Sequence, residues 1–244
     1  MKAGRSAPVL FVPETDSTNL AVRDLAAQGA ADGTVLYALR QSAGRGRLGR
    51  SFASPEGGLY YSMLLEASAE PARDLLLTPA AGLAVCRAIE RVCALRCGIK
   101  WPNDLLLDGK KVCGILAEGF AAGPRRCLAL GIGVNVNTAA FPPELRETAV
   151  SLRQLCGRET EIAALAGALT EELDAAIAAA RRGERALLED YRARCVTIGR
   201  EVLVIGNGES REATALGVNG DYSLAVRFAD GREAAVSSGE VSIR

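Results

Sequence analysis

The sequence predicts a chain of mixed helices and strands that ends in a small β-barrel. Up to about residue 194, apolar residues at helical spacing alternate with short apolar stretches that are typical of strands. After Cys195 the chain changes to five short strand-like stretches separated by turn signals, a pattern typical of a small barrel. We therefore expect two domains, residues 1–194 and residues 195–244.

The individual elements follow from spacing, caps and breakers. The expected strands are 34–40, 59–67, 98–101, a hairpin over 104–120 that turns at Asp108–Gly109, and 127–134. The expected helices are 17–29, capped by Ser17 or Thr18, then 71–93, 160–182 and 184–194. We interpret the last two helices as packing elements. In the barrel, turns are expected at Asn207–Gly208, Asn219–Gly220, Asp230–Gly231 and Ser238–Gly239.

The charge balance and the residue types exclude several functions. Lysines and arginines number 29, and so do aspartates and glutamates, so the formal net charge is zero. Nothing in that balance indicates nucleic-acid binding through bulk charge. The chain contains no histidine, which excludes Ser-His-Asp hydrolysis, Cys-His catalysis and most zinc sites.

The seven cysteines indicate a cytosolic protein. Their number is odd and no pair has Cys-x-x-Cys spacing, so we expect reduced, buried thiols. The apolar run at 7–12 is too short for a signal peptide, and Pro13 ends it. No segment approaches the ~20 apolar residues of a membrane span. The expected location is therefore the cytoplasm, with no membrane partner.

The segment GRGRLGRS, Gly44–Ser51, is the first candidate binding site. Its glycines allow backbone amides to turn toward an anion, and its arginines supply planar, permanently charged groups that suit phosphate or carboxylate. A solvated surface loop and an arginine–glycine RNA-binding segment are the alternatives. The segment is not a Walker loop, because the Gly-Lys-Ser/Thr ending is missing. Taken alone, it favours anion binding.

Two further segments place charged residues beside expected strands. In KWPNDLLL, Lys100–Leu107, the pair Asn103 and Asp104 could equally form a turn or hold Mg²⁺ or a lysine ammonium. In KKVCGILAEG, Lys110–Gly119, a lysine opens an apolar strand, which is usually a surface position. Gly114 in that strand nevertheless indicates the close approach of a ligand or of another backbone.

Two more segments have ordinary explanations when taken alone. GIGVNVN, Gly131–Asn137, reads as a strand that ends in an asparagine-rich turn, although glycines there would let a flat ligand lie on the backbone. ETDSTN, Glu14–Asn19, places two hydroxyls at a helix N-terminus. Helix capping explains one hydroxyl, and a polar ligand head could use both.

Taken together and in this order, the five segments resemble the biotin protein ligases (biotin–[acetyl-CoA-carboxylase] ligases). The ordered set is specific, although each motif alone is not, and the resemblance extends to the terminal GEVSIR. The matching stretches are Asp16-Ser17-Thr18-Asn19, Gln41–Arg50, Lys100–Asp104, Lys111–Glu118 and Gly131–Asn137.

The resemblance implies an α+β fold of the class II synthetase type, with a mixed, largely antiparallel sheet, helices packed against it and an SH3-like C-terminal barrel. It also implies two reactions. Biotin and MgATP give biotinoyl-5′-AMP and pyrophosphate, and a lysine of a biotin carboxyl carrier protein then attacks this intermediate. Biotin and ATP are thus expected substrates, Mg²⁺ accompanies ATP, and no tightly bound prosthetic group is expected.

The resemblance further implies roles for individual residues. Those implied in biotin binding are Ser17, Thr18, Asn19, Gln41, Gly44, Arg45, Lys111 and Gly114. Those implied in ATP binding are Arg47, Arg50, Phe52, Asn103, Asp104, Asn135 and Arg244. Lys111, Arg45 and Arg47 are the expected catalytic residues, with Lys111 between the biotin carboxylate and the α-phosphate. Asn135 is expected to face adenine, and Asp104 is the expected Mg²⁺ ligand.

The sequence departs from the family pattern at two points. Leu48 stands where arginine is often found, which leaves the other three arginines of the segment in place. Some members carry an N-terminal winged helix-turn-helix, but here ETDSTN begins at residue 14. We therefore expect a monofunctional ligase, either monomer or homodimer, that does not bind operator DNA. The alternatives are a lipoate–protein ligase of the same superfamily and, more remotely, a non-catalytic RNA-binding module.

Overall fold

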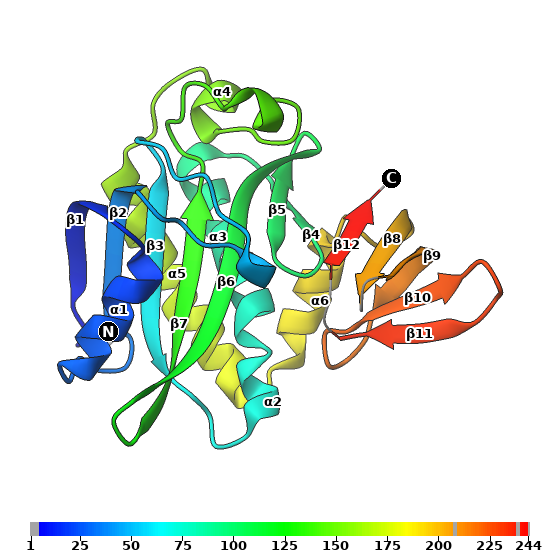
Figure 1. Ribbon diagram of the computed structural model, residues 1–244, viewed down its shortest axis with the longest axis horizontal. Coiled ribbons are helices and arrows are strands. Elements are labelled where there is room, and N and C mark those ends of the chain that lie inside the picture. Colours follow the sequence, from blue (N-terminus) through cyan, green and yellow to red (C-terminus); the bar gives the residue numbers. More distant parts are fainter. Residues whose placement is uncertain (1–4, 207–208, 238–239, 244) are drawn as a thin grey trace.

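The computed structural model describes residues 5–206, 209–237 and 240–243, and these form two sheets with helices packed on the larger one (Figure 1). The large sheet has the order β1-β2-β3-β7-β6-β5-β4. Its strands are β1 (Val9–Thr15), β2 (Val35–Gln41), β3 (Leu59–Glu66), β4 (Gly98–Lys100), β5 (Asp104–Leu107), β6 (Lys110–Ala122) and β7 (Arg125–Val134). All neighbours in it pair antiparallel except β1 and β2. The expected mixed, largely antiparallel sheet is confirmed.

The helices and the second sheet complete the described chain. The helices are α1 (Thr18–Ala27), α2 (Pro71–Asp74), α3 (Leu77–Cys93), α4 (Leu152–Cys156), α5 (Ile162–Arg182) and α6 (Arg185–Arg194), with 3₁₀ turns η1 (Arg47–Gly49) and η2 (Pro143–Leu145). The second sheet, called here the C-terminal sheet, is antiparallel with the order β11-β10-β9-β8-β12. Its strands are β8 (Glu201–Gly206), β9 (Glu209–Val218), β10 (Leu224–Phe228), β11 (Glu233–Val236) and β12 (Glu240–Ile243).

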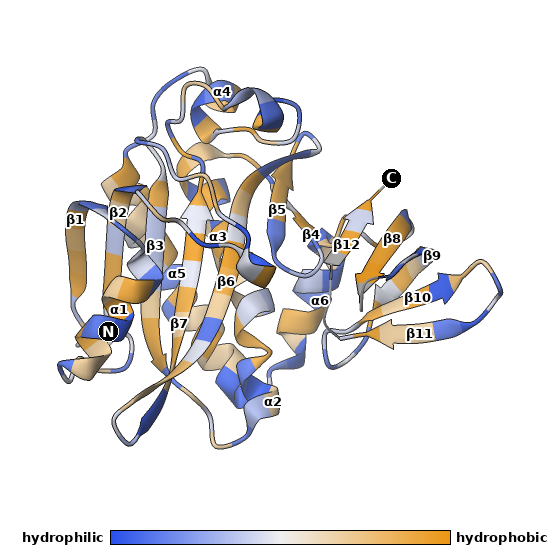
Figure 2. Ribbon diagram, viewed as in Figure 1, coloured by the Kyte–Doolittle hydropathy of each residue, from blue (hydrophilic) through white to orange (hydrophobic). Residues whose placement is uncertain are grey.

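The two faces of the large sheet are covered by different helices (Figure 1). Leu36 and Leu64 pack beneath α1, whereas their chain neighbours Val35 and Leu65 belong to the larger core under α3 and α5. This alternation is the period of two that a strand imposes on its side chains. The central strands are accordingly apolar along most of their length (Figure 2).

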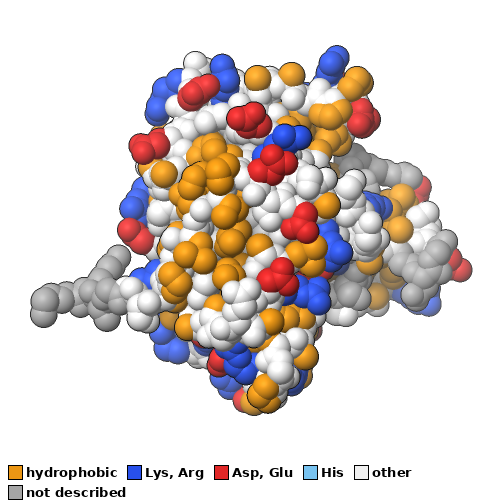
Figure 3. Space-filling view, turned by 60° about the vertical axis from the view of Figure 1, so that its left-hand side comes forward, with side chains coloured by type: hydrophobic (Ala, Val, Ile, Leu, Met, Phe, Trp, Pro, Cys, Tyr) orange, Lys and Arg blue, Asp and Glu red, His pale blue; other side chains and the backbone are white. Residues whose placement is uncertain are grey.

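The sequence did not predict β1, which lies at the free edge of the large sheet. The run at 7–12 was expected to end at Pro13, but the strand continues to Thr15. Pro13 has no amide hydrogen to donate, and an edge strand tolerates this because one of its sides has no partner strand. Val9 and Phe11 are 45% and 51% exposed, and hydrophobic side chains gather on this side of the molecule in Figure 3.

The helix expected over 71–93 is two helices. Pro79 explains the break, because its missing amide cannot donate to the carbonyl of Leu75. The chain instead restarts as α3 at Leu77, which places Pro79 in a first turn where that amide is not needed. The short helix α4 was not predicted. It begins with a capping box in which Ser151 and Gln154 bond reciprocally to each other's backbone.

The expected hydroxyl cap of α1 is wrong. Ser17 occupies the N-cap position, but its side chain makes no capping bond. The carboxylate of Asp16 instead accepts a hydrogen bond from the Ser17 amide at 2.6 Å. The hydroxyls of Ser17 and Thr18 are therefore not committed to holding the helix end, and both residues are buried on the site side of α1.

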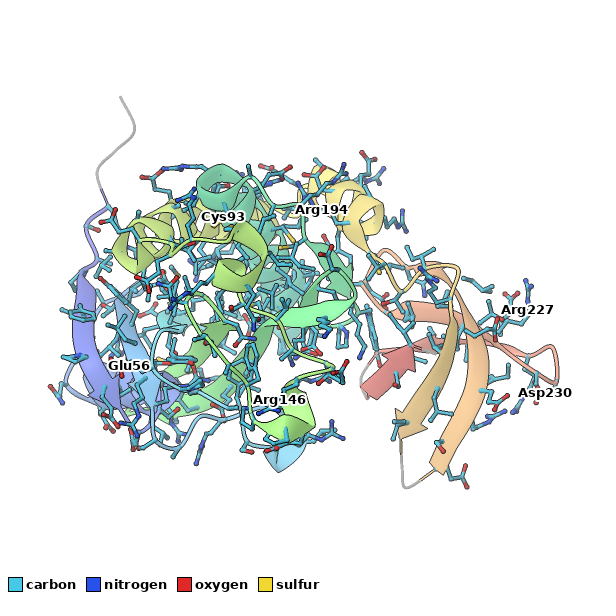
Figure 4. The ribbon with its side chains drawn as sticks, turned by 90° about the horizontal axis from the view of Figure 1, so that it is seen from above. Glu56, Cys93, Arg146, Arg194, Arg227 and Asp230 are labelled. Atoms are coloured by element: carbon cyan, nitrogen blue, oxygen red, sulfur yellow. The ribbon has the colours of Figure 1, made fainter. Side chains whose placement is uncertain are left out.

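The C-terminal sheet is attached to the large sheet beside β4. The Val196 amide donates to the Ile99 carbonyl at 2.9 Å. Trp101 donates from its backbone amide to the Thr197 hydroxyl and from its indole to the Tyr222 carbonyl, both at 2.9 Å. Seen from above, the two sheets lie side by side, with Arg227 and Asp230 at the end farthest from the large sheet (Figure 4).

Parts of the expected C-terminal organisation are not covered by the structure. The turn residues Asn207–Gly208 and Ser238–Gly239 lie outside the described residues, as does Arg244. The proposed boundary near Cys195 stays a prediction. None of the helices in the described ranges is both long and apolar enough to cross a membrane.

The seven cysteines are all free thiols, and five of them are buried. Cys93, in the helical layer of Figure 4, and Cys156 are only partly buried. Burial raises the pKa of the Cys113 thiol, so very little of it is thiolate at pH 8. We expect alkylation at pH 8 to label two cysteines in the native protein and the other five only after denaturation, measured by intact mass. Fast labelling at Cys113 would contradict this packing.

Candidate active site

The Gly44–Ser51 segment, called here the Gly/Arg loop, forms a closed loop between β2 and β3. The Gly46 amide donates to the Arg50 carbonyl at 2.8 Å, and the Phe52 amide donates to the Gly44 carbonyl at 2.9 Å. Between these bonds lies η1, in which Leu48 has a φ of 56° and a side chain that is 73% exposed. The loop is thus held at its base while its tip extends into solvent.

Two arginines of this loop contact residues of the Lys100–Leu107 and Lys110–Gly119 segments. Arg47 Nη1 donates to Asn103 Oδ1 at 3.1 Å. Arg45 Nη1 lies 3.7 Å from Glu118 Oε1. Arg50 is exposed on the same loop. The loop therefore brings its positive charge over β6 and the turn between β4 and β5.

Lys111 and Asp104 form the shortest ion pair of this region, with 2.6 Å between Lys111 Nζ and Asp104 Oδ1. They meet because β5 and β6 pair antiparallel with a register shift between Leu105 and Leu106. The turn before β5 includes a cis Trp101–Pro102 peptide bond. Asn103 is fixed there by a bond from its amide to the Ile115 carbonyl at 2.8 Å. A cation and a carboxylate thus lie in contact beside Asn103, the residue that accepts the hydrogen bond from Arg47.

Lys110 points away from this position. Its ammonium donates to the Arg146 carbonyl at 3.0 Å and lies 3.8 Å from the exposed Glu147 carboxylate. Neighbouring side chains of a strand point to opposite faces, so Lys111 and Lys110 have different surroundings although they are adjacent. The expectation that Lys111 is the inward lysine is in accord with its ion pair.

A buried polar network occupies the space between α1, β2 and β3. Gln41 Oε1 accepts hydrogen bonds from the Thr18 amide at 2.8 Å and from the Thr18 hydroxyl at 3.1 Å. The Gln41 amide donates to the Ser54 hydroxyl at 2.9 Å, and that hydroxyl donates to the Phe52 carbonyl at 2.9 Å. This half of the network joins the end of the Gly/Arg loop to the helix N-terminus.

The other half of the network is centred on Ser62 and Asn19. The Ser62 hydroxyl lies 2.7 Å from both Thr18 Oγ1 and Asn19 Oδ1. Asn19 Nδ2 donates to Glu118 Oε2 at 2.7 Å, and Glu118 also faces Arg45. A ligand head with both donors and acceptors would find partners of each kind here.

Glycines form the floor of the site. Gly114 and Gly133 are directly opposite each other on β6 and β7. The Phe52 ring lies on them, so that a Cβ at Gly133 would be 2.6 Å from the ring and one at Gly114 would be 3.0 Å from it. A Cβ at Gly131 would overlap the Asn19 side chain. At Gly114 a ligand or another backbone was expected to approach closely, whereas the atoms that do so in the structure belong to the side chains of Phe52 and Lys111.

The polar network, the glycine floor and Lys111 line one cavity of about 60 Å³. Phe52 forms part of its wall and makes an edge contact with Tyr60, with 6.5 Å between ring centroids. Burial raises the pKa of Tyr60, so its hydroxyl stays protonated and donates to the Pro55 carbonyl at 2.8 Å. Phe52 must shift before a ligand much larger than a few water molecules can enter.

A larger cavity of about 800 Å³ lies on the other side of Phe52 and Lys111. One wall is apolar, with Phe141, Leu145 and Ala149. Asn135 lies at its base, 5% exposed, and its amide donates to the Lys111 carbonyl at 3.3 Å and the Val150 carbonyl at 3.2 Å. The contact of Asn135 with adenine stays a prediction.

Most residues of this site were predicted from the sequence, but not all of them. The residues that the structure brings together are Ser17, Thr18, Asn19, Gln41, Gly44, Arg45, Arg47, Arg50, Phe52, Asn103, Asp104, Lys111, Gly114 and Asn135. Ser62 was overlooked, and Gly131 was noted only as part of GIGVNVN, without its contact to Asn19. Ser62 had a visible signal, because it is the one hydroxyl-bearing aliphatic residue in the otherwise apolar strand LYYSMLLE.

The described residues offer limited support for a protein-bound metal. No group of three or more potential metal-ligating side chains occurs in the described ranges. Asp104 supplies one carboxylate, and Mg²⁺ commonly uses one or two carboxylates together with phosphate oxygens and water. The site therefore fits a metal that arrives with a nucleotide.

Residues 11–135 match the sequence pattern of the Biotin/lipoate A/B protein ligase family. The Biotin--[acetyl-CoA-carboxylase] ligase of Mycobacterium tuberculosis is 37% identical over 237 residues, which are 94% of this chain and 86% of that protein. The Bifunctional ligase/repressor BirA of Bacillus subtilis is 40% identical over 149 residues, or 59% of this chain and 46% of that protein. The match thus spans about half the length of the Bacillus relative.

The fold is similar to solved structures over almost its whole length. The structure titled biotin protein ligase from Aquifex aeolicus in complex with biotin and ATP aligns with a TM-score of 0.84 and 27% identity, covering 98% of this chain and 99% of that one. A biotin protein ligase from Leishmania major in complex with biotin aligns with a TM-score of 0.70 at 24% identity, a likeness in fold.

Proposed function

Because the chain belongs to the biotin/lipoate A/B protein ligase family, we propose that it is an ATP-dependent biotin protein ligase. In this proposal it activates biotin as biotinoyl-5′-AMP and transfers biotin to a lysine of a biotin carboxyl carrier protein. One observation carries the proposal: Lys111, Arg45 and Arg47 converge on a cavity whose other wall is a buried network of donors and acceptors. The network suits the ureido head of biotin, and the cations suit its carboxylate.

In the first step a biotin carboxylate oxygen attacks the α-phosphorus of ATP, and the bond to the bridging oxygen of pyrophosphate breaks. Two anions approach each other, and charge builds on the phosphoryl oxygens in the transition state. Lys111 is the cation nearest the junction of the two cavities, and its ammonium can leave Asp104 for the two reacting oxygens. Arg45 and Arg47 add charge from the loop above.

In the second step the neutral amine of the acceptor lysine attacks the acyl carbon, AMP leaves, and the amine loses a proton. Asp104 and Asn103 lie at the edge of the cavity where that amine would arrive, and Asp104 can orient it by accepting a hydrogen bond. Mg²⁺ bound with ATP would supply further charge neutralisation at the phosphates, with Asp104 as its protein ligand. Closure of the Gly/Arg loop would exclude water from the hydrolysable intermediate.

The proposal is tested by ATP–pyrophosphate exchange, measured separately with biotin and with lipoate. Exchange that depends on biotin, followed by biotin transfer to a carrier domain, is the expected result. Exchange that depends on lipoate alone would replace the proposal with lipoate ligation. We further propose that the protein acts in the cytoplasm and holds no permanently bound prosthetic group.

The Gly/Arg loop is expected to become protease-resistant when ligand binds. Its glycines leave the backbone much conformational entropy to lose, and its tip, with Leu48 73% exposed, is open to trypsin. Trypsin should cleave after Arg45, Arg47 or Arg50 in the free protein, and biotin with ATP should slow this cleavage several-fold, as followed by mass spectrometry. Cleavage at Arg185, on the surface helix α6, serves as the internal control. Equal rates with and without ligand would argue against closure.

A further inference from the structure

The large cavity extends beyond Lys111 to the place where the C-terminal sheet meets β4. There the Val196 amide donates to the Ile99 carbonyl at 2.9 Å, and Ile99 forms a parallel bridge with Cys195. The chain around 96–100 consequently runs beside the chain around 196–200. Arg96, Lys100 and Arg200 all line the cavity at this outer end.

These three cations have no ion-pair partner among the described residues, and they share one cavity wall. Elsewhere on the surface, arginines commonly lie beside carboxylates, as Arg91 does 2.8 Å from Glu171. The acids on the cavity wall are already engaged, because Asp104 pairs with Lys111 and Glu147 with Lys110.

One acid remains at this end, Asp108 at the tip of the β5–β6 hairpin. Three cations against one carboxylate leave net positive charge in a recess between two sheets. Low-dielectric walls concentrate such a field, so the recess should attract an anion of high charge.

We propose that Arg96, Lys100 and Arg200 form a polyphosphate site that takes the β- and γ-phosphates of the nucleotide and the pyrophosphate formed from them. The proposal rests on the proposed function for the identity of the nucleotide. It follows from the continuity of the cavity, because Lys111 at the inner end serves the α-phosphate while the outer cations are the next positive groups along the same wall. The C-terminal sheet thereby contributes Arg200 directly to substrate binding.

Inorganic tripolyphosphate tests the site without requiring any reaction. It is titrated calorimetrically into the full chain in the absence of biotin, and the variant is the double substitution Arg96→Gln/Arg200→Gln. Both side chains are exposed, so their replacement should leave the fold intact. Removing two charged contacts should weaken binding by ~10-fold or more. The control is Arg126→Gln, an exposed arginine at the start of β7 outside the cavity lining.

The outcomes separate this site from the ligase proposal. Loss of tripolyphosphate affinity in the double variant, together with a similar rise in the KM for ATP and unchanged binding by the control, supports the site. Tripolyphosphate binding equal to that of the parent overturns it, even if biotin-dependent exchange is normal. A parent-like affinity with a raised KM for the carrier protein would also overturn it, in favour of protein docking. If the double variant loses tripolyphosphate affinity but the parent protein shows no biotin-dependent ATP–pyrophosphate exchange, the polyphosphate site is supported and the ligase proposal is rejected.

Discussion

Replacing Lys111 with alanine is expected to slow biotinoyl-AMP formation by ~10²–10³-fold, the usual effect of losing one electrostatic contact to a transition state. The ammonium lies 2.6 Å from Asp104 at the junction of the two cavities, where both the carboxylate and the α-phosphate would gain charge. Biotin affinity should fall much less, because the head-group network does not include Lys111. Single-turnover adenylation and equilibrium biotin binding measure the two effects separately.

Lys110→Ala is the matched control, since its ammonium bonds to the Arg146 carbonyl on the other side of the strand. It should adenylate at close to the parent rate. Lys111→Arg should rescue poorly, because a broad planar group cannot occupy the place of a compact ammonium. Transfer from preformed biotinoyl-AMP should be less affected than adenylation. A crippled Lys110→Ala, or a Lys111→Ala that adenylates normally, would show that the assignment is wrong.

Replacing Gly131 with alanine is expected to weaken biotin binding by ~10–100-fold while the protein stays folded. The new methyl group would overlap the Asn19 side chain, which is 4% exposed and bonded to both Ser62 and Glu118. Displacing Asn19 breaks a buried hydrogen bond to Ser62, worth ~1–3 kcal/mol when its partner is left unsatisfied, and a part-buried one to Glu118. Biotin titration, with circular dichroism to verify the fold, measures the effect.

Gly119→Ala on the same β6–β7 hairpin controls for the effect of alanine in a strand. The nearest atom to its new methyl group would be Leu128 Cδ2 at 4.0 Å, an ordinary van der Waals contact. This variant should bind biotin like the parent. If Gly131→Ala does so too, the head of the ligand does not bind at Asn19, and the polar network has another role.

Local patterns predicted most of the fold because most of its strands are visible in the sequence as short, continuous apolar stretches. The β5–β6 hairpin was predicted with its turn, since Asp108–Gly109 interrupts two apolar runs and adopts positive φ. The edge strand β1 was not predicted, because Pro13 interrupts its apolar pattern and its partner β2 is separated from it in the sequence by α1. The helix α4 had a readable capping-box signature, Ser151 to Gln154, that was overlooked.

The site, like the fold, has a part that could be predicted from the sequence and a part that could not. Lys111, Asp104 and the loop arginines could be identified because the five motifs, taken together and in order, resemble those of the biotin protein ligases, although each motif alone left its role open. The contact between Gly131 and Asn19, and the position of Ser62 beneath Thr18, depend on the register of β3 against β7. Register is a long-range property, so no window of the sequence contains it. The burial of the Asn135 amide against two carbonyls was hidden for the same reason.

The chain has a single tryptophan, and its fluorescence reports on the contact between the C-terminal sheet and the large sheet. Trp101 is 3% exposed and bonds to Thr197 and Tyr222, while the turn that follows it carries Asn103 and Asp104. Detachment of the C-terminal sheet would hydrate the indole, shift its emission to the red and loosen this turn at the same moment. On heating, enzyme inactivation should therefore follow tryptophan emission, even where the helical signal at 222 nm persists to higher temperature.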